Sequence, residues 1–104
     1  MSMVHVVAVI IAKPGKRDEI LTAFKANVPN VEAEDGCIEY GATVDADGLG
    51  GFQTKFGDDT FVVVEKWASV DALKAHAVAP HMAGYAAKTK DMIANRTIHV
   101  LSPA

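Results

Sequence analysis

A chain of 104 residues, 50% of them hydrophobic, has room for one domain with a thin but real core. Its formal net charge of −3, without any stripe of Lys and Arg, argues against a nucleic-acid partner. The apolar run near the start ends at Ala12 and is too short to span a bilayer, so no membrane partner is expected. The lone Cys37 excludes an internal disulfide and fits a reducing compartment. We therefore expect a cytoplasmic protein with a single domain over residues 1–104.

The first part of the chain carries a strand pattern followed by a helix pattern. Residues 4–12 (VHVVAVIIA) are apolar at odd and even positions, which predicts a strand that is buried on both faces. Residues 17–26 combine an apolar stripe with early acidic side chains, which predicts a helix. Pro29 is expected to kink or break that helix. Residues 30–34 are then expected to resume it, and Gly36 to stop it.

The middle of the chain predicts two more strands around a long loop. Residues 37–44 (CIEYGATV) form the first of them. Residues 45–59 are rich in glycine and predict a long, mobile loop or a weak hairpin around Gly50-Gly51. Residues 60–67 (TFVVVEKW) are β-branched and apolar, which predicts a strand.

The last part of the chain predicts a broken helix and a final strand. Ser69 is placed to cap a helix, and a helical pair is expected from residue 69 to about residue 94. Pro80 divides the pair, because it pushes Ala79 away from helical geometry and suits the first position of a new helix. Residues 97–101 (TIHVL) predict the fourth strand.

The order of these elements predicts the fold class. A β-α-β-β-α-β succession is the ferredoxin-like arrangement, an α+β fold with both helices on one face of a four-stranded antiparallel sheet. The first and third strands are apolar on both faces, yet the two helices can cover only one. The other face would be a large exposed apolar patch. We therefore expect a homodimer in which two sheets pack face to face.

Polar side chains gather on the third strand and on the broken helix after it. Glu65 is expected to face inward, as a base, as an anchor that orients a histidine, or as half of a structural ion pair. His76 and His81 are five residues apart across Pro80, which is not the spacing of a helical zinc site, and a metal would need Glu65 as well. We expect no metal. Neutral imidazoles suit proton transfer from a phenol, and structural histidines are the alternative.

Aromatic and thioether side chains occur near these polar groups. Trp67 and Tyr85 are expected to line an aromatic pocket and donate one hydrogen bond each, with core packing as the alternative. Met82 and Phe24 are expected as apolar lining. No GxGxxG, GxxxxGK[ST], GxSxG or CxxC motif occurs, so no nucleotide or dithiol site is predicted.

Several short passages together resemble the antibiotic biosynthesis monooxygenase (ABM) domain family of the dimeric α+β barrel superfamily. The resemblance covers nearly the whole chain, as a single ABM-like domain. Its most recognisable pieces are Lys13-Pro14-Gly15-Lys16, Glu34-Asp35-Gly36-Cys37-Ile38-Glu39-Tyr40, Glu65-Lys66-Trp67, and His76 with Ala79-Pro80-His81. The order and spacing of these pieces are specific for the domain but not for one reaction.

The resemblance implies a pocket between the helices and the sheet, and three candidate functions. The first is a monooxygenase that oxidises a small phenol or quinol without any cofactor. In that reading His81 or His76 accepts the proton, Glu65 orients the imidazole, and Trp67 and Tyr85 hold the ring. The second is a homodimer that binds a small metabolite without catalysis. The third is an isomerase of a small phosphorylated carbonyl compound, with the histidines as acid and base.

Overall fold

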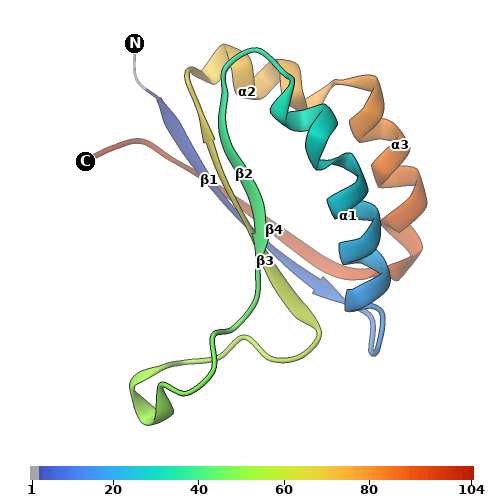
Figure 1. The fold of residues 1–104 in the computed structure, drawn as a ribbon, viewed down its shortest axis with the longest axis vertical. Coiled ribbons are helices and arrows are strands. Elements are labelled where there is room, and N and C mark those ends of the chain that lie inside the picture. Colours follow the sequence, from blue (N-terminus) through green and yellow to red (C-terminus); the bar gives the residue numbers. More distant parts are fainter. Residues whose placement is uncertain (1–2) are drawn as a thin grey trace.

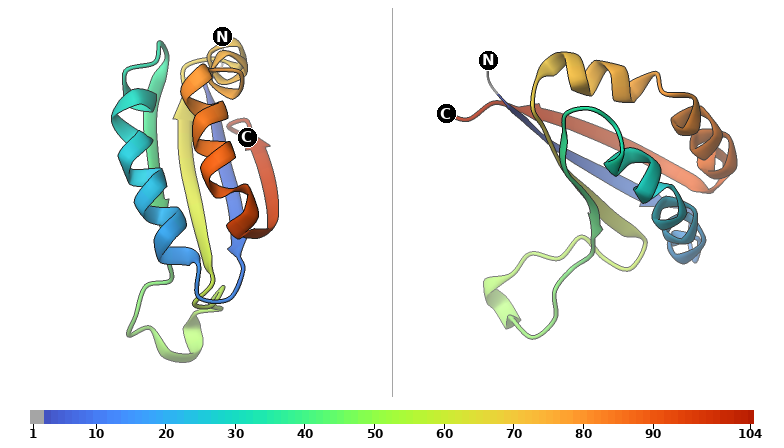
Figure 2. Two further views of the ribbon diagram at one scale, coloured as in Figure 1. Left: turned by 90° about the vertical axis from the view of Figure 1, so that its right-hand side faces the viewer. Right: turned by 45° about the horizontal axis from the view of Figure 1, so that its top comes forward.

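The computed structural model describes residues 3–104, which form a four-stranded antiparallel sheet with the three α-helices on one face (Figures 1 and 2). The strand order is β2-β3-β1-β4, so the predicted α+β, ferredoxin-like arrangement is confirmed. The elements are β1 (Val4–Ala12), α1 (Arg17–Glu32), β2 (Cys37–Thr43), η1 (Gly50–Phe52), β3 (Thr60–Trp67), α2 (Val70–Ala77), α3 (Pro80–Thr89), η2 (Lys90–Met92) and β4 (Ile93–Leu101). Across residues 3–104, the helices are all too short or too polar to cross a membrane.

The core lies between the sheet and its helices. Along β1 every second side chain is buried, as the two-residue period of a strand requires. On α1 the buried side chains fall on one helical face, which lies against the sheet. The buried hydrophobic residues are Val4, Val6, Ala8, Ile10 and Ala12 of β1, Ile20, Phe24 and Val31 of α1, Tyr40 of β2, and Phe61, Val63 and Trp67 of β3.

The opposite face of the sheet carries apolar side chains that no helix in the described chain covers. We call it the open face and define it by Val7, Val9 and Ile11 of β1 and Val62 and Val64 of β3. Val7 is paired with Val64 and Val9 with Val62. All five are at least partly exposed, and Ile11 reaches 38%. The prediction that residues 4–12 are buried on both faces is therefore wrong for the single subunit, although the second apolar face is present.

Helix α1 runs through Pro29 as one helix, so the predicted break is wrong. Proline in a helix removes one hydrogen bond to the carbonyl four residues earlier. Here Pro29 is exposed, where water can replace the lost bond. Phe24 on one side and Val31 on the other are buried against the sheet. Packing on both sides of the proline holds the helix together, because tertiary contacts supply most helical stability.

The end of the chain also differs from the prediction. Helix α3 ends at Thr89, and β4 begins at Ile93 rather than residue 97. The extra strand residues pair with β1, with Ile93 opposite Ala12 and Asn95 opposite Ile11. This ladder joins segments far apart in sequence, so the local helical pattern could not reveal it.

Residues 44–59 form what we call the arm, a connection from β2 to β3 that projects away from the helices (Figure 1). Of the two predicted alternatives the arm is a long loop rather than a hairpin, and it contains the short turn η1 at Gly50–Phe52. The Asp45 carboxylate accepts hydrogen bonds from the backbone N–H groups of Phe56 at 2.9 Å and Gly57 at 2.8 Å. These two bonds tie the outgoing limb of the arm to the returning limb.

Candidate active site

The joint between α2 and α3 places two histidines together. As predicted, Ser69 caps α2, and its Oγ accepts the Ala72 N–H at 3.1 Å. Ala79 is extended (φ −63°, ψ 138°), and Pro80 opens α3. His76 therefore lies in the last turn of α2, and His81 lies at the start of α3.

A glycine turn brings a carboxylate to these histidines. Gly36 has a φ of +84°, and a Cβ built there would lie 2.6 Å from the Cβ of Ala72. Only glycine allows the chain to pass this close beneath α2. The Gly36 carbonyl accepts the Ala68 N–H at 2.8 Å, which fixes the turn to the end of β3. Glu34, two residues earlier, is thereby held under His76.

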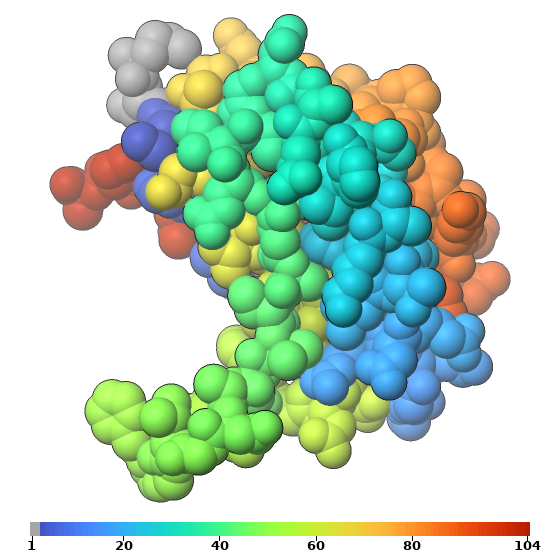
Figure 3. All heavy atoms as spheres, in the orientation of Figure 1, coloured from blue at the N-terminus to red at the C-terminus, as the bar shows by residue number. Residues whose placement is uncertain are grey.

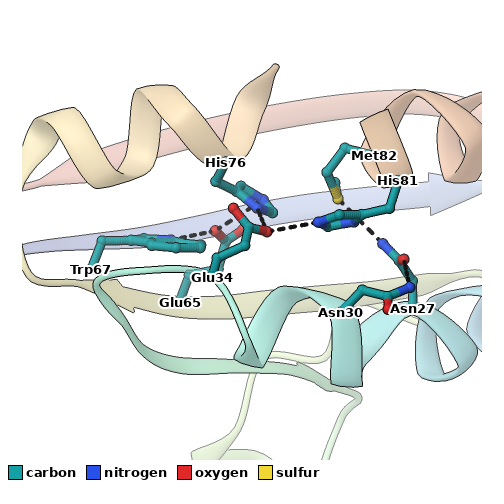
Figure 4. A network of polar contacts seen from close by, with 8 residues as sticks. All are labelled: Asn27, Asn30, Glu34, Glu65, Trp67, His76, His81 and Met82. Atoms are coloured by element: carbon teal, nitrogen blue, oxygen red, sulfur yellow. Dashed lines mark hydrogen bonds and ion pairs between the residues drawn. The ribbon is translucent and has the colours of Figure 1, made fainter. Parts of the chain in front are cut away.

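Five side chains then form what we call the carboxylate–imidazole cluster: Glu34, Glu65, Trp67, His76 and His81 (Figure 4). Oε2 of Glu34 lies 2.9 Å from Nδ1 of His76 and 3.1 Å from Nε2 of His81. Oε1 of Glu65 lies 3.9 Å from Nε2 of His76 and accepts the Trp67 indole N–H at 2.9 Å. Polar contacts thus run in an unbroken line from the indole to His81.

The inner end of the cluster is dry and the outer end reaches solvent. Trp67 is fully buried, His76 is 5% exposed and Glu65 is 7% exposed. The side chain of His81 is 24% exposed and that of Glu34 16%. In Figure 4 His81 lies where α3 faces the helix that carries Asn27 and Asn30. The cluster is therefore more accessible from solvent at this outer end.

Burial decides the acid–base character of Glu65. Removal from water raises the pKa of its carboxyl above the ordinary value, and the charge of Glu34 raises it further. The hydrogen bond from Trp67 and the proximity of His76 act against this rise without cancelling it. Glu65 therefore holds a proton more readily than an exposed glutamate does.

Aromatic rings enclose the cluster. The His76 ring centroid lies 4.6 Å from that of Trp67 and 5.5 Å from that of Tyr40. Phe24 stacks on Tyr40 at 5.0 Å and meets Tyr85 edge-on at 6.0 Å. Burial raises the pKa of Tyr85 to about 12 and also raises that of Tyr40. Both phenols therefore stay protonated near neutral pH and can act as hydrogen-bond donors.

The structure gathers most of the predicted site residues but changes some of their surroundings. His76, His81, Glu65 and Trp67 lie in one cluster. Met82 lies beside His81, where its sulfur accepts a weak hydrogen bond from the Asn27 side chain at 3.4 Å. Phe24 is 2% exposed and belongs to the core, and Tyr85 packs against its ring. Among residues 3–104 we find no group of three or more His, Cys, Asp or Glu side chains arranged to hold a metal.

Two site residues were missed in the sequence: Glu34, a member of the cluster, and Tyr40, which packs against His76. Both fall within the passage 34–40 that carries the family resemblance, which was the only signal for them. Glu34 is 42 residues from His76, so no spacing rule could connect the two. The pocket that the resemblance implies between the helices and the sheet stays a prediction. A cavity of about 290 Å³ lies beside the arm, lined from β2, the arm and β3.

Comparison with known proteins places the chain in a family. The family model described as antibiotic biosynthesis monooxygenase matches residues 3–88. The Escherichia coli K12 protein named "Probable quinol monooxygenase YgiN" is 35% identical over 103 residues, which cover 97% of this chain and 98% of that protein.

Solved structures agree with this assignment. The Mycobacterium tuberculosis protein Rv0793 is 28% identical with a TM-score of 0.80, covering 99% of this chain and 96% of its own. PA3566 from Pseudomonas aeruginosa has a TM-score of 0.81 at 22% identity, covers 100% of this chain and 96% of its own, and shows the fold alone. The chain belongs to the antibiotic biosynthesis monooxygenase family.

Proposed function

We propose that this protein is a cofactor-independent monooxygenase of a small phenol or quinol, with His81 as the base. The observation that carries the proposal is the state of the His81 ring. Both ring nitrogens are shielded from solvent, and neither has a hydrogen-bond partner. Nε2 lies 3.1 Å from Oε2 of Glu34, without the direction of a hydrogen bond. A ring held this way is available to a ligand hydroxyl.

The position of Glu34 selects the nitrogen that acts as the base. A carboxylate beside Nε2 favours the tautomer with its proton on Nε2, which leaves the lone pair on Nδ1. Nδ1 can then accept the hydroxyl proton of the substrate. Glu34 takes the orienting role that we expected of Glu65, because it lies next to both histidines while Glu65 is 3.9 Å from His76.

Proton removal is the step that makes the oxygen chemistry feasible. Ground-state O₂ needs a one-electron donor, and a phenolate supplies an electron more easily than a phenol does. A quinol and O₂ then give a hydroxyquinone and water: one oxygen atom enters the ring, and the other leaves with two substrate hydrogens. The substrate supplies every electron, so the protein has to bind, deprotonate and exclude water. The name of the Escherichia coli relative, a quinol monooxygenase, supports this substrate class.

We also propose that the protein works as a homodimer joined through the open face. Val7, Val9 and Ile11 of β1 lie there beside Val62 and Val64 of β3, on the two central strands of the sheet. An apolar patch of this kind marks an interaction surface in soluble proteins. A second copy offers a self-complementary surface and covers both patches at once.

The isomerase alternative loses its main support. A phosphorylated substrate would need a cationic cluster, and Lys13, Lys16 and Arg17 are near one another in sequence. They precede or begin α1, whereas Glu34 follows its end. A helix of 16 residues is about 24 Å long, so these cations lie too far from the cluster to bind a substrate there. Non-catalytic binding of a small aromatic molecule remains the competing function, and the experiment below separates it from catalysis.

The test is oxygen uptake by metal-stripped protein with a panel of naphthoquinols. We expect uptake without added iron or flavin, and a rate at least about 100-fold lower in His81→Ala, as for loss of a general base. Lys88→Ala, at an exposed position of α3, is the control and should behave as the wild type does. Fluorescence of Trp67, the single tryptophan, reports ligand binding in each variant.

Three results would contradict the proposal. Tight binding without uptake for every quinol would identify a binding protein. Uptake that requires iron or flavin would exclude the cofactor-independent mechanism. Full activity in His81→Ala would remove His81 as the base.

A further inference from the structure

We propose that the arm of each subunit grips the other subunit of the dimer, with Phe52 as its apolar anchor. The inference rests on the homodimer proposed above and goes further, because it assigns a segment and a residue outside the sheet to the contact. The arm of each subunit would then cover part of the surface of the other subunit.

The arm exposes large hydrophobic side chains. Phe52 is 92% exposed, Phe56 60% and Leu49 51%. Aromatic side chains bury 150 to 250 Å² when they are covered, so leaving two of them in water is unfavourable. Three such residues within one short connection are more than the single exposed hydrophobic residues that are normal on a protein surface. These exposed side chains therefore favour a contact that removes them from water.

The arm does not fold back to cover these residues itself. The Asp45 carboxylate joins its two limbs through the N–H groups of Phe56 and Gly57. At its root the Thr43 hydroxyl donates to the Val62 carbonyl at 2.8 Å. Lys55 and Asp47 add an ion pair at 3.4 Å. An arm held in one direction pays less ordering entropy when a partner binds, which favours a preformed contact surface.

The direction of the arm points to the open face. It projects from the sheet on the side away from the helices, and in space-filling view a hollow separates it from the body (Figures 1 and 3). The cavity of about 290 Å³ beside it is lined from β2, the arm and β3. Val62, an open-face residue, lines this cavity, as does Gln53 of the arm. Oε1 of Gln53 is buried without a hydrogen-bond partner, so the lining has an acceptor to offer.

These features favour a second copy as the occupant. The arm that carries the exposed apolar residues projects on the side of the open face (Figure 1), so a single partner can reach both. Packed sheets lie about 10 Å apart, and a subunit seated on the open face therefore lies alongside the projecting arm. In a two-fold dimer the contact forms twice, because each arm meets the other subunit.

The test compares dimer dissociation constants by sedimentation velocity for the wild type, Phe52→Ser and Val78→Ser. Because the dimer loses the Phe52 contact twice, we expect the dissociation constant of Phe52→Ser to rise by about 100-fold or more. Val78 is also apolar and 81% exposed, but it lies between α2 and α3 on the helix side. Val78→Ser should leave the constant within about twofold of wild type, since surface substitutions have small effects.

A second measurement follows the arm itself. Hydrogen exchange of residues 46–56 should be slower at concentrations where the wild type is a dimer than after dilution to monomer. Circular dichroism melting of Phe52→Ser should match the wild-type monomer, because this side chain makes little contact within its own subunit.

The outcomes separate the arm from the dimer. An unchanged dissociation constant in Phe52→Ser, with a dimeric wild type, would overturn the arm proposal and leave the dimer in place. Arm exchange that is independent of dimerisation would do the same. A wild type that stays monomeric at every concentration would overturn both.

Discussion

Beneath the helices the sheet buries a carboxylate and an imidazole, whereas its opposite face leaves valine and isoleucine side chains in contact with solvent. Glu65 is 7% exposed and His76 5%, while Ile11 on the open face is 38% exposed. Soluble proteins usually do the reverse, because burying a charge costs several kcal/mol and exposing apolar surface forfeits hydrophobic stabilisation.

The difference teaches where function resides on this sheet. Neither arrangement is explained by the stability of one subunit, so each needs a purpose beyond folding. The buried polar groups are satisfied by one another through Glu34 and Trp67, which suits proton transfer in a dry site. The exposed apolar groups need a second molecule. One face carries the proposed chemistry, and the other the proposed assembly.

The largest expected effect comes from placing a charge on the open face. Val9→Asp puts a carboxylate at the centre of the proposed interface, where an unpaired buried charge costs several kcal/mol. We expect the dimer dissociation constant to rise by about 1000-fold or more, measured by sedimentation velocity. Ala26→Asp adds the same charge to the exposed side of α1 and is the control. A Val9→Asp protein that remains dimeric as the wild type does would show that the subunits meet elsewhere.

The next largest effect is expected from Glu34 in the carboxylate–imidazole cluster. Removing its charge in Glu34→Gln removes the preference for a proton on Nε2 of His81. We expect kcat for quinol oxidation to fall by about 100-fold, with KM within about threefold, because the change affects proton transfer rather than binding. Glu34→Asp should restore part of the rate, whereas Glu32→Gln, exposed at the end of α1, should leave it unchanged. If Glu34→Gln and Glu34→Asp both lose kcat in proportion to the folding stability that they lose, Glu34 has a structural role only.

A smaller effect is the pH dependence contributed by Glu65. Its pKa in the folded protein is raised above the ordinary value of 4.5, chiefly by burial. The folded state therefore binds this proton more tightly than the unfolded chain does. The resulting stabilisation is fully present below the unfolded pKa and is lost as the pH rises through the folded pKa.

Urea unfolding from pH 4 to pH 8 measures this effect against Glu65→Gln, which does not titrate. The wild-type free energy of unfolding should fall relative to that of the variant as the pH rises. Trp67 keeps an acceptor for its N–H in the variant, so the comparison isolates the titration. Parallel curves for the two proteins would show that burial does not perturb Glu65.

The smallest effect is expected in the arm. Asp45→Ala removes the acceptor for the Phe56 and Gly57 N–H groups, and their hydrogen exchange should become at least about tenfold faster. In the wild type these bonds hold the pKa of the Asp45 carboxyl below its usual range. The bonds are therefore at full strength at pH values above that range, and they weaken as the pH falls through the lowered pKa. Asp58→Ala, in the same arm, is the control. Unchanged exchange in Asp45→Ala would mean that something else holds the arm.

Local patterns predicted much of this molecule correctly. Ser69 as a cap and the Ala79-Pro80 joint depend on atoms only a few residues apart, so the sequence shows them directly. The same holds for the alternation that places Glu65 and Trp67 on one face of β3. Pro29 was misjudged because its local cost is real, but packing of the flanking turns on the sheet outweighs it.

The sequence by itself determined the order of the strands and helices, the two-sided apolar character of β1 and β3, and the residue types available for proton transfer. Tertiary structure alone decided that Glu34 reaches both histidines, since that contact depends on a close passage at Gly36 between segments 42 residues apart. Tertiary structure also decided that the arm projects from the sheet on the side of the open face. Periodicity and capping act over a few residues, whereas contacts between distant segments depend on how whole elements pack.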